Sequence, residues 1–387
     1  MGIRGLCKFL HEKKAVKYHE SLNDFLDKYK KNYIDYCRLG IDSSVYMYRY
    51  KQVHGKYFLL ALLKQSFKFL LSNVIPVYIF DGKPPDEKKE VLKHRHQRRL
   101  KNSEKLMKIQ KIEQDICLDC KYIPPSEGFK PINYEKEVLR ISKQLVRVQK
   151  EDVNNVINML NICKIPFIHS QEEADTALGE LYRQGYIDFA LTYDMDLLLR
   201  GCKKIISFTP GGHIEEYDLD YILERLGLTY DQFVDMSILF GCDGVPQFIK
   251  NDNYKHYQLG IYNLIVEYGS IEKILNILYV NNNCILNTQI EEYLDKCINA
   301  RLKYNERNAN IINNKFSTDI TERIDFDALL SHVDNIISTQ KIMINGRSYS
   351  PISNVPFKIY HGYLDVTDIH NTICKLNTKI RGGKFKM

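Results

Sequence analysis

The sequence predicts an α/β protein with a doubly wound, mostly parallel central sheet flanked by helices. Two observations support this fold class. Short apolar segments alternate along the chain with longer helical segments, which is typical of strand–helix–strand units. Four of the apolar segments also end in acidic residues. Because the carboxyl ends of parallel strands meet at one edge of a sheet, where ligands bind, we expect these acids to converge on one crevice.

The four strands predicted to lead into acids follow one another with helices between them. In chain order they are residues 38–41 with Asp42, residues 75–80 with Asp81, residues 165–169 with Glu173 and Asp175, and residues 189–192 with Asp194 and Asp196. An apolar helix is expected over residues 57–71. After the fourth strand we expect a further strand over 203–208, a turn at 211–212, and helices over 220–226 and 233–240. The last helix leads to a seventh acid, Asp243.

The stretch from Ser170 to Asp196 holds four of the seven acids, and each pair has an ordinary alternative explanation. Ser170 is expected to cap a helix, so that Glu173 and Asp175 lie in its first turn. The same spacing is also a capping box, in which Glu173 would only bond the backbone. The Asp194–Asp196 pair is equally compatible with a solvated loop or with a phosphatase motif. A phosphatase would usually carry Thr or Val where this chain has Leu198.

A strongly basic stretch separates the second and third predicted strands. Cationic residues dominate residues 88–111, and Lys88, Arg95 and Arg99 recur at helical spacing on about one face. A solvated helix face is the usual explanation for such a run. Since this one begins a few residues after Asp81, we favour phosphate binding. Prolines near residues 124–131 interrupt the helix.

A second basic helix is expected over about 133–148, with Lys143 and Arg147. The two helices are expected to arch over the crevice.

Composition excludes several classes of protein. Of the 387 residues, 44% are hydrophobic and 27% charged, near the average for globular chains, and no run approaches the ~20 apolar residues that span a bilayer. The N-terminal segment has no apolar signal-peptide core and no myristoylation motif. The ten cysteines lack a disulfide-scaffold spacing, so we expect reduced, intracellular thiols. Cys117 and Cys120 form the only close pair, and zinc would require a second pair.

The chemistry follows from the ligand type. Seven carboxylates without clustered His or Cys select a hard cation, so Mg²⁺ or Mn²⁺ is expected rather than zinc. Two such ions ~4 Å apart can clamp a phosphodiester, one activating water and the other stabilising the leaving oxygen. No Ser–His or Cys–His set is evident. The net charge of +7 does not by itself require a polyanionic partner. Together, the seven acids and the basic stretch predict metal-dependent phosphodiester hydrolysis on a nucleic acid.

Six sequence blocks resemble the flap endonuclease family of structure-specific 5′-nucleases, over about residues 1–280. They are MGIRGL at 1–6, IDSS at 41–44, VYIFDGKPP at 77–85, EEAD at 172–175, TYDMD at 192–196 and FVDMSILFGCD at 233–243. The resemblance implies a PIN-like nuclease core with a helical arch and a helix-hairpin-helix-like element. A composition rich in Lys, Asn, Ile and Tyr indicates an AT-rich genome and leaves a viral member open.

The resemblance also implies roles for individual residues. One metal would be held by Asp42, Asp81, Glu173 and Asp175, and the other by Asp194, Asp196 and Asp243. Lys88 and Arg95 would hold the scissile phosphate. Tyr48 would stack on a base beside the cut, and Gly2 would bring the amino terminus near the site. Arg99, Lys143 and Arg147 are expected to contact DNA.

The function implied is cleavage of 5′ flaps, nicks or branched DNA, as endonuclease or 5′–3′ exonuclease, in replication, recombination or repair. Two alternatives stay open: a catalytically silent scaffold that binds branched DNA, and a ribonuclease of a related acid-cluster fold. We expect a monomer in the nucleus, which is the host nucleus for a viral member, with a cytoplasmic replication site as the alternative.

The chain departs from the family pattern in three places. Residues 117–131 form an insertion in the arch, and residues 251–253 and 260–261 replace the Gly-Ile-Gly turn of the duplex-binding hairpin. No clamp-binding peptide is present at the C-terminus. The expected domains are an N-terminal nuclease region (1–105), an arch (106–150), an internal nuclease region (151–280) and a variable C-terminal region (281–387).

Overall fold

The computed structural model describes residues 2–29, 36–83, 88–119, 134–248, 257–280, 284–305, 327–329, 331–332, 342–344, 347–349 and 366–381. Its N-terminal half contains α1 (Leu6–Glu12), β1 (Lys17–His19), α2 (Leu22–Tyr29), β2 (Cys37–Asp42), α3 (Ser43–His54), the 3₁₀ turn η1 (Gly55–Tyr57), α4 (Phe58–Leu71), β3 (Val74–Phe80), α5 (Lys89–Asp119), α6 (Tyr134–Leu145), α7 (Lys150–Ile162), β4 (Phe167–His169), α8 (Ala174–Arg183) and β5 (Phe189–Leu191). The remainder contains α9 (Asp196–Leu199), β6 (Lys204–Phe208), β7 (Ile214–Asp218), α10 (Leu219–Leu226), α11 (Tyr230–Phe240), α12 (Tyr257–Tyr268), α13 (Ile271–Val280), α14 (Cys284–Asn305), β8 (Ile342–Ile344), β9 (Arg347–Tyr349) and α16 (Val366–Arg381).

The central sheet has seven strands in the order β1-β7-β6-β5-β2-β3-β4. Neighbours from β6 to β4 are parallel, whereas β7 is antiparallel to both β6 and β1. The predicted mostly parallel sheet is therefore confirmed. From β2 the chain moves outward through β3 and β4, then returns to place β5 on the other side of β2. This reversal of strand order creates a switch point between β2 and β5, where doubly wound sheets bind their ligands.

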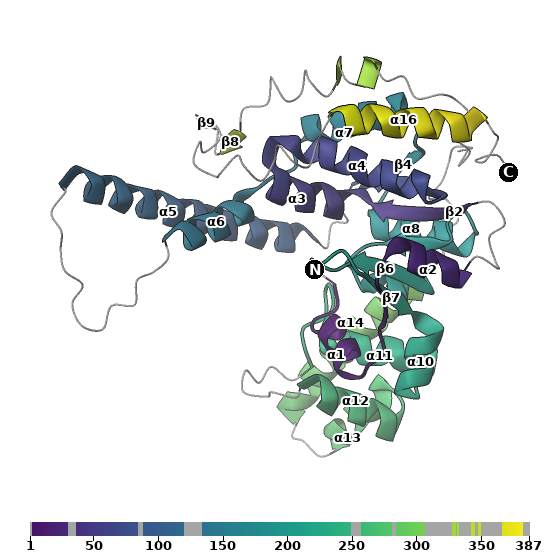
Figure 1. The fold of residues 1–387 in the computed structure, drawn as a ribbon. Coiled ribbons are helices and arrows are strands. Elements are labelled where there is room, and N and C mark those ends of the chain that lie inside the picture. Colours follow the sequence, from purple (N-terminus) through teal and green to yellow (C-terminus); the bar gives the residue numbers. More distant parts are fainter. Residues whose placement is uncertain are drawn as a thin grey trace.

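Helices cover both faces of the sheet, and each face has its own hydrophobic core (Figure 1). The strand β3 is buried along its whole length, as expected for a parallel strand covered on both sides. On one face α8 packs very closely on β2. A Cβ at Gly40 would lie 2.5 Å from Ile187 Cδ1 and 2.6 Å from Leu178 Cδ2, so a larger residue would displace these side chains. This contact fixes α8, which carries two of the predicted acids.

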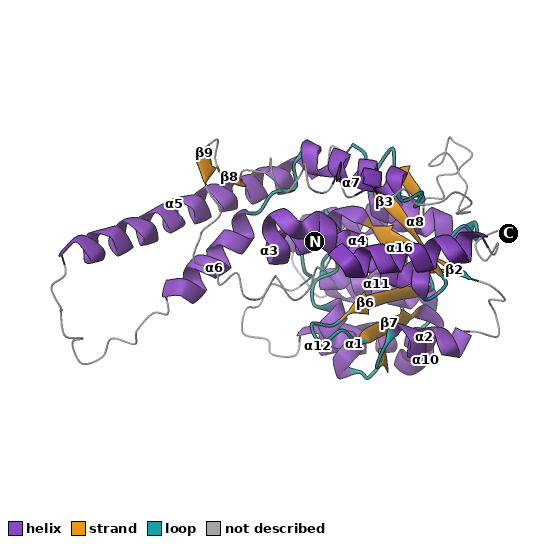
Figure 2. Cartoon of the chain, turned by 45° about the horizontal axis from the view of Figure 1, so that its top comes forward, coloured by secondary structure: helices purple, strands orange, loops and turns teal. Residues whose placement is uncertain are grey.

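Helices α5 and α6 form an arm that extends away from the sheet (Figures 1 and 2). Asn102 of α5 donates a hydrogen bond to Gln144 of α6 at 2.8 Å, and Lys105 pairs with Glu137 at 2.7 Å. The insertion predicted at 117–131 begins in the last turn of α5, and its residues from 120 onward lie outside the described residues, as do residues 251–253. Gly260 and Ile261 lie inside α12 and do not form a turn.

Several local predictions differ from the structure. The second arm helix ends at Leu145, and a separate helix, α7, follows from Lys150. Strands β1 and β7 were not predicted. Strand β1 has only three residues, too few to show an apolar pattern, and two adjacent glutamates interrupt the apolar pattern of β7. Helix α5 crosses the predicted boundary at 105/106, and the domain boundaries remain a prediction. Within the described residues, no helix is long and apolar enough to cross a membrane.

The C-terminal helix α16 packs on α4, far along the chain (Figure 1). Leu376 and Ile373 of α16 are buried in the core that α4 also lines, and Lys379 Nζ donates to Asn73 Oδ1 at 2.9 Å. This helix therefore covers apolar surface that α4 would otherwise expose.

We expect Leu376→Ala to lower the free energy of unfolding by about 2–4 kcal/mol, because it opens a cavity between α16 and α4. Urea unfolding followed by circular dichroism would measure this, since the chain contains no tryptophan. Lys375→Ala, on the exposed side of the same helix, is the matched control. Equal stability of the two variants would contradict the packing of α16.

Candidate active site

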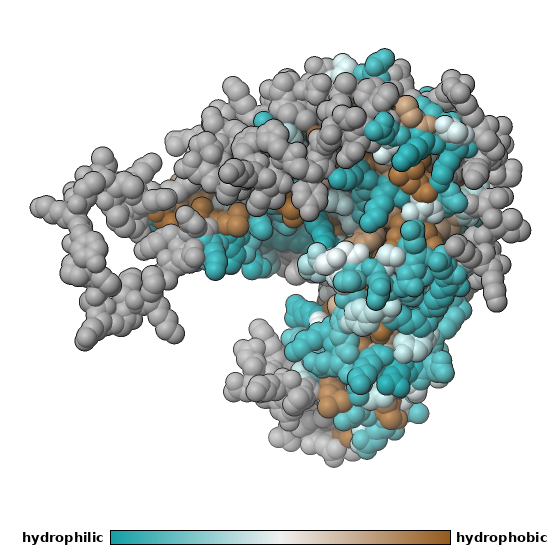
Figure 3. All heavy atoms as spheres, viewed as in Figure 1, coloured by the Kyte–Doolittle hydropathy of each residue, from teal (hydrophilic) through white to brown (hydrophobic). Residues whose placement is uncertain are grey.

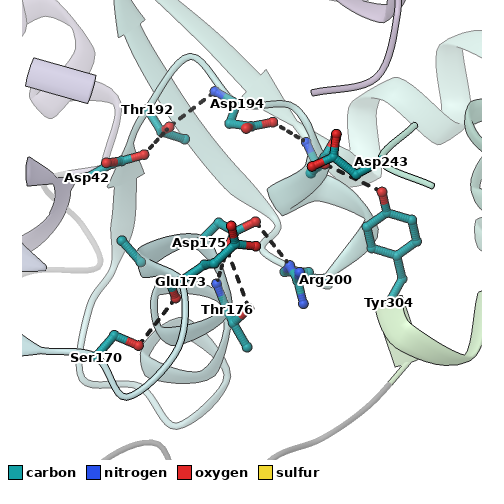
Figure 4. A network of polar contacts seen from close by, with 12 residues as sticks. Asp42, Ser170, Glu173, Asp175, Thr176, Thr192, Asp194, Arg200, Asp243 and Tyr304 are labelled. Atoms are coloured by element: carbon teal, nitrogen blue, oxygen red, sulfur yellow. Dashed lines mark hydrogen bonds and ion pairs between the residues drawn. The ribbon is translucent and has the colours of Figure 1, made fainter. Parts of the chain in front are cut away.

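The seven predicted acids lie close enough to influence one another's charge at the carboxyl end of the sheet, and Figure 4 labels five of them: Asp42, Glu173, Asp175, Asp194 and Asp243. Burial and the charges of Asp81, Asp175 and Asp194 raise the pKa of Asp42. Burial and the charges of Asp194, Asp175 and Asp243 raise the pKa of Asp196. Glu173 is linked to Asp175 in the same way. The convergence expected from the strand order is therefore present.

Asp42 and Asp81 end two neighbouring parallel strands, β2 and β3. Asp42 caps α3, because its Oδ1 accepts a hydrogen bond from Val45 N–H at 3.1 Å. Burial, reinforced by the charge of Asp81, raises the pKa of Asp42 to about 7. Asp81 Oδ1 accepts from Ala174 N–H at 2.8 Å, and its Oδ2 accepts from the Ser44 hydroxyl. Asp81 thus ties β3 to the first turn of α8.

The helix that carries Glu173 and Asp175 begins differently from the prediction. Its N-cap is Glu173, whose side chain makes no capping bond. Ser170 lies three residues earlier: its Oγ accepts from Glu172 N–H at 3.2 Å and donates to Glu173 O at 3.3 Å. The predicted cap at Ser170 and the capping box are both wrong, because Asp81 from the neighbouring strand binds the free N–H of the first turn. The Glu173 carboxylate is therefore available for another partner.

Asp194 and Asp196 lie close together through a turn rather than along a strand. Asp196 is the first residue of α9, and its N–H donates to Asp194 Oδ1 at 3.1 Å. Thr192 holds this turn next to Asp42, since its hydroxyl donates to Asp42 Oδ2 at 3.4 Å and accepts from Asp194 N–H at 3.1 Å. Burial raises the pKa of both acids, and for Asp196 the neighbouring acids add to the effect.

Lys88 is a cation in direct contact with two acids of the cluster. Its Nζ lies 2.6 Å from Glu173 Oε1 and 2.8 Å from Asp243 Oδ2, so it bridges α8 and the segment after α11. Although burial opposes it, hydrogen bonding to these two carboxylates raises the pKa of Lys88, which stays charged. Burial also raises the pKa of Glu173, while Lys88 lowers it.

Two glycines allow the backbone to approach the acids. A Cβ at Gly2 would lie 2.3 Å from Asp194 Oδ1, so the N-terminal segment touches the cluster as predicted for Gly2. A Cβ at Gly82 would lie 2.2 Å from Ser170 O, and Gly82 N–H donates to Glu172 O at 2.6 Å. Gly82 therefore fixes the segment after Asp81 against the approach to α8.

Two residues in contact with the cluster were missed from the sequence. Arg200 Nε lies 3.5 Å from Asp175 Oδ2, and the Tyr304 hydroxyl donates to Asp196 Oδ2 at 3.4 Å (Figure 4). Both side chains are buried. A cation directly after the three leucines that follow Asp196 is a signal in the sequence that could have identified Arg200. Tyr304 lies in α14, within the predicted variable C-terminal region (281–387).

The other predicted contact residues lie at the surface, and all of them except the half-buried Arg99 are exposed. Tyr48 is 38% exposed on α3. Arg95 and Arg99 lie on α5, Lys143 on α6 and Arg147 just after α6. In the space-filling view, the surface is hollowed between the arm and the lobe that carries α12 and α13 (Figure 3). The chain's N-terminal end lies at the inner side of this hollow (Figure 1). The structure thus places Tyr48 on α3 and the four cations on or next to the arm, and their roles remain predictions.

The donor set fits a hard divalent cation. Asp196 Oδ1 is buried and has no hydrogen-bond partner among the described residues, which is costly for a carboxylate oxygen without a cation. The ammonium group of Lys88 takes a cation's place between Glu173 and Asp243. As the described side chains stand, no three His, Cys, Asp or Glu form a complete ligand set. A bound cation would therefore require Lys88 and some carboxylates to move.

Fold and cluster together define the class of protein: a PIN-like nuclease core, with carboxylates at the switch point of a mostly parallel sheet. Two family models match the chain. The XPG N-terminal domain matches residues 1–102 and the XPG I-region matches residues 164–243. Over these two regions the chain is similar to the XPG family of nucleases. The stretch between the two matches contains most of the arm.

Curated relatives agree with this assignment. Flap endonuclease 1 from Xiphophorus maculatus is 27% identical over 295 residues, covering 71% of this chain and 68% of the relative. Flap endonuclease 1 from Danio rerio is 27% identical over 303 residues, covering 73% of this chain and 70% of the relative.

Solved structures share the fold. The catalytic core of Rad2 in complex with DNA substrate has a TM-score of 0.58 at 16% identity, covering 87% of this chain and 96% of that one. Flap endonuclease-1 from Methanococcus jannaschii has a TM-score of 0.54 at 14% identity, covering 95% of this chain and 97% of that one.

Proposed function

We propose that this chain is a divalent-metal-dependent, structure-specific DNA nuclease that cuts phosphodiester bonds at 5′ flaps, nicks or branch points. The observation that carries the proposal is the coupled cluster of seven carboxylates at the switch point, within a family whose relatives include flap endonuclease 1. Two Mg²⁺ ions, or Mn²⁺ in their place, would supply an activated water and charge neutralisation at the phosphate. We propose that the chain acts as a monomer in the nucleus, in DNA replication, recombination or repair.

The residues divide into two ligand groups in this proposal. Asp42, Asp81, Glu173 and Asp175 come from β2, β3 and α8 and would hold one ion. Asp194, Asp196 and Asp243 follow β5 and α11 and would hold the other.

Lys88 bridges the two groups through Glu173 and Asp243. If these acids held a cation, the ammonium group of Lys88 would be released from them and could bind the scissile phosphate. Arg95 lies about two helical turns further along the arm, on nearly the same face, where it can bind the same strand. The arm itself carries the cations Arg99 and Lys143, which suit a phosphate backbone.

A panel of labelled substrates tests the proposal. The chain would be incubated with Mg²⁺ and a 5′ flap, a nick, a gap, a four-way junction or an RNA flap of matched sequence. We expect cleavage of DNA near the junction, and none in EDTA. Cleavage that persists in EDTA would contradict the two-metal proposal. Faster cutting of the RNA flap would favour the ribonuclease alternative, and tight binding without cleavage would favour the silent scaffold.

A further inference from the structure

Two buried side chains, Arg200 and Tyr304, connect the acid cluster to α14, which lies after residue 280. Arg200 is 8% exposed and Tyr304 is 6% exposed. The Arg200 guanidinium carbon lies 5.7 Å from the centre of the Tyr304 ring, within the range of a cation–π contact. Figure 4 shows Arg200 between Asp175 and Tyr304. The side chains of Arg200 and Tyr304 are therefore in contact with each other as well as with the acids.

Arg200 supplies positive charge where the cluster is buried. A buried guanidinium is costly unless it is paired, and the carboxylate of Asp175 is its ion-pair partner at 3.5 Å. Its charge also acts on Asp196 and Glu173. Arg200 thus offsets part of the mutual repulsion of three acids.

Tyr304 distinguishes the two oxygens of Asp196. Its hydroxyl donates to Oδ2 at 3.4 Å, whereas the buried Oδ1 has no hydrogen-bond partner in the described part of the chain. Burial raises the pKa of the Cys242 thiol, next to Asp243, and the nearby Tyr304 hydroxyl lowers it. Tyr304 therefore contacts one acid directly and lies near the residue before another. Its helix, α14, packs on α11, which leads to Asp243.

We propose that Arg200 and Tyr304 are positioning residues for the metal ligands. Arg200 holds Asp175, and Tyr304 fixes the rotamer of Asp196 so that Oδ1 stays open to the cation. The region after residue 280 is then part of the catalytic centre. This inference rests on the proposed function, because it assumes that the acids bind metal. Hydrogen-bond partners of metal ligands typically change metal affinity or activity by about 10–100-fold when they are removed.

The first experiment is Tyr304→Phe, which keeps the ring on Arg200 and removes only the hydroxyl. Mn²⁺ binding is measured by electron paramagnetic resonance, and the melting temperature is measured in EDTA. We expect the Mn²⁺ Kd to rise about tenfold while the melting temperature changes little. Tyr293→Phe is the matched control, because Tyr293 lies on the same helix and its hydroxyl donates to Pro246 O at 3.1 Å. Unchanged Mn²⁺ affinity in Tyr304→Phe would overturn the role of Tyr304.

The second experiment is Arg200→Leu, with Arg200→Lys as the variant that keeps the charge. In EDTA, we expect Arg200→Leu to have a lower melting temperature than the wild type. Adding Mg²⁺ should raise the melting temperature of Arg200→Leu by more than it raises that of the wild type. The values for Arg200→Lys should lie between those of Arg200→Leu and the wild type. An equal loss with and without Mg²⁺ would indicate a purely structural role and overturn the inference. A wild-type chain that neither binds Mn²⁺ nor cleaves DNA would instead contradict the proposed function itself.

Discussion

Asp81→Asn should lower kcat by about 10³-fold or more and leave the fold intact. The loss corresponds to several kcal/mol of transition-state stabilisation, the contribution expected of a correctly held metal ion. The amide oxygen of asparagine can still accept the hydrogen bond from Ala174 N–H at the start of α8, so the helix keeps its cap. Only the negative charge is lost. Single-turnover cleavage of a labelled 5′ flap in Mg²⁺ measures the effect.

Asp81→Ala separates the two roles of this residue. It removes both the charge and the acceptor for Ala174 N–H, so we expect the same loss of cleavage plus about 1 kcal/mol of stability. Asp220→Asn is the control acid, because Asp220 is exposed and pairs with Lys203 away from the cluster. Substantial cleavage by Asp81→Asn would show that Asp81 caps α8 and does not serve as a ligand.

The sheet and its acids were predictable because their signals are local. Each strand is a short apolar run, and the residue after β2 or β3 must lie at the edge where parallel strands end. Strand order alone then brings Asp42 and Asp194 together at the switch point. The same reasoning predicted the basic arm, whose cations recur over a long helix.

The contacts between distant segments could not be predicted from local patterns. The first turn of α8 is capped by Asp81 across the sheet, so the serine spacing at Ser170 was misleading. Asp194 and Asp196 are related by a turn that begins α9, which the apolar run before them does not specify. Tyr304 lies 108 residues from Asp196, and no motif surrounds it. Such contacts depend on tertiary packing.

Asp42→Asn should stabilise the metal-free chain at pH 8 and abolish cleavage in Mg²⁺. In the folded chain burial raises the pKa of Asp42 to about 7, from 3.8 for an unperturbed aspartate. The folded state therefore binds a proton that the unfolded state releases. Stability from this group is greatest below pH ~4 and is lost as pH rises toward 7, by up to about 4 kcal/mol. Asparagine stays neutral and avoids this loss.

The pH dependence distinguishes this effect from better packing. In EDTA, the variant should exceed the wild type in free energy of unfolding by about 2–4 kcal/mol at pH 8, and the two should coincide near pH 4. The hydrogen bond from Val45 N–H to Oδ1 can persist in both, so the cap of α3 does not differ. In Mg²⁺ the wild type should recover, because a bound cation stabilises the charged form that burial disfavours. A stability difference that is independent of pH would mean that Asp42 is not the strained acid of the cluster. The expected pH-dependent difference would show that the buried carboxylate of Asp42 lowers the stability of the metal-free chain, and that the chain keeps this carboxylate for binding a cation.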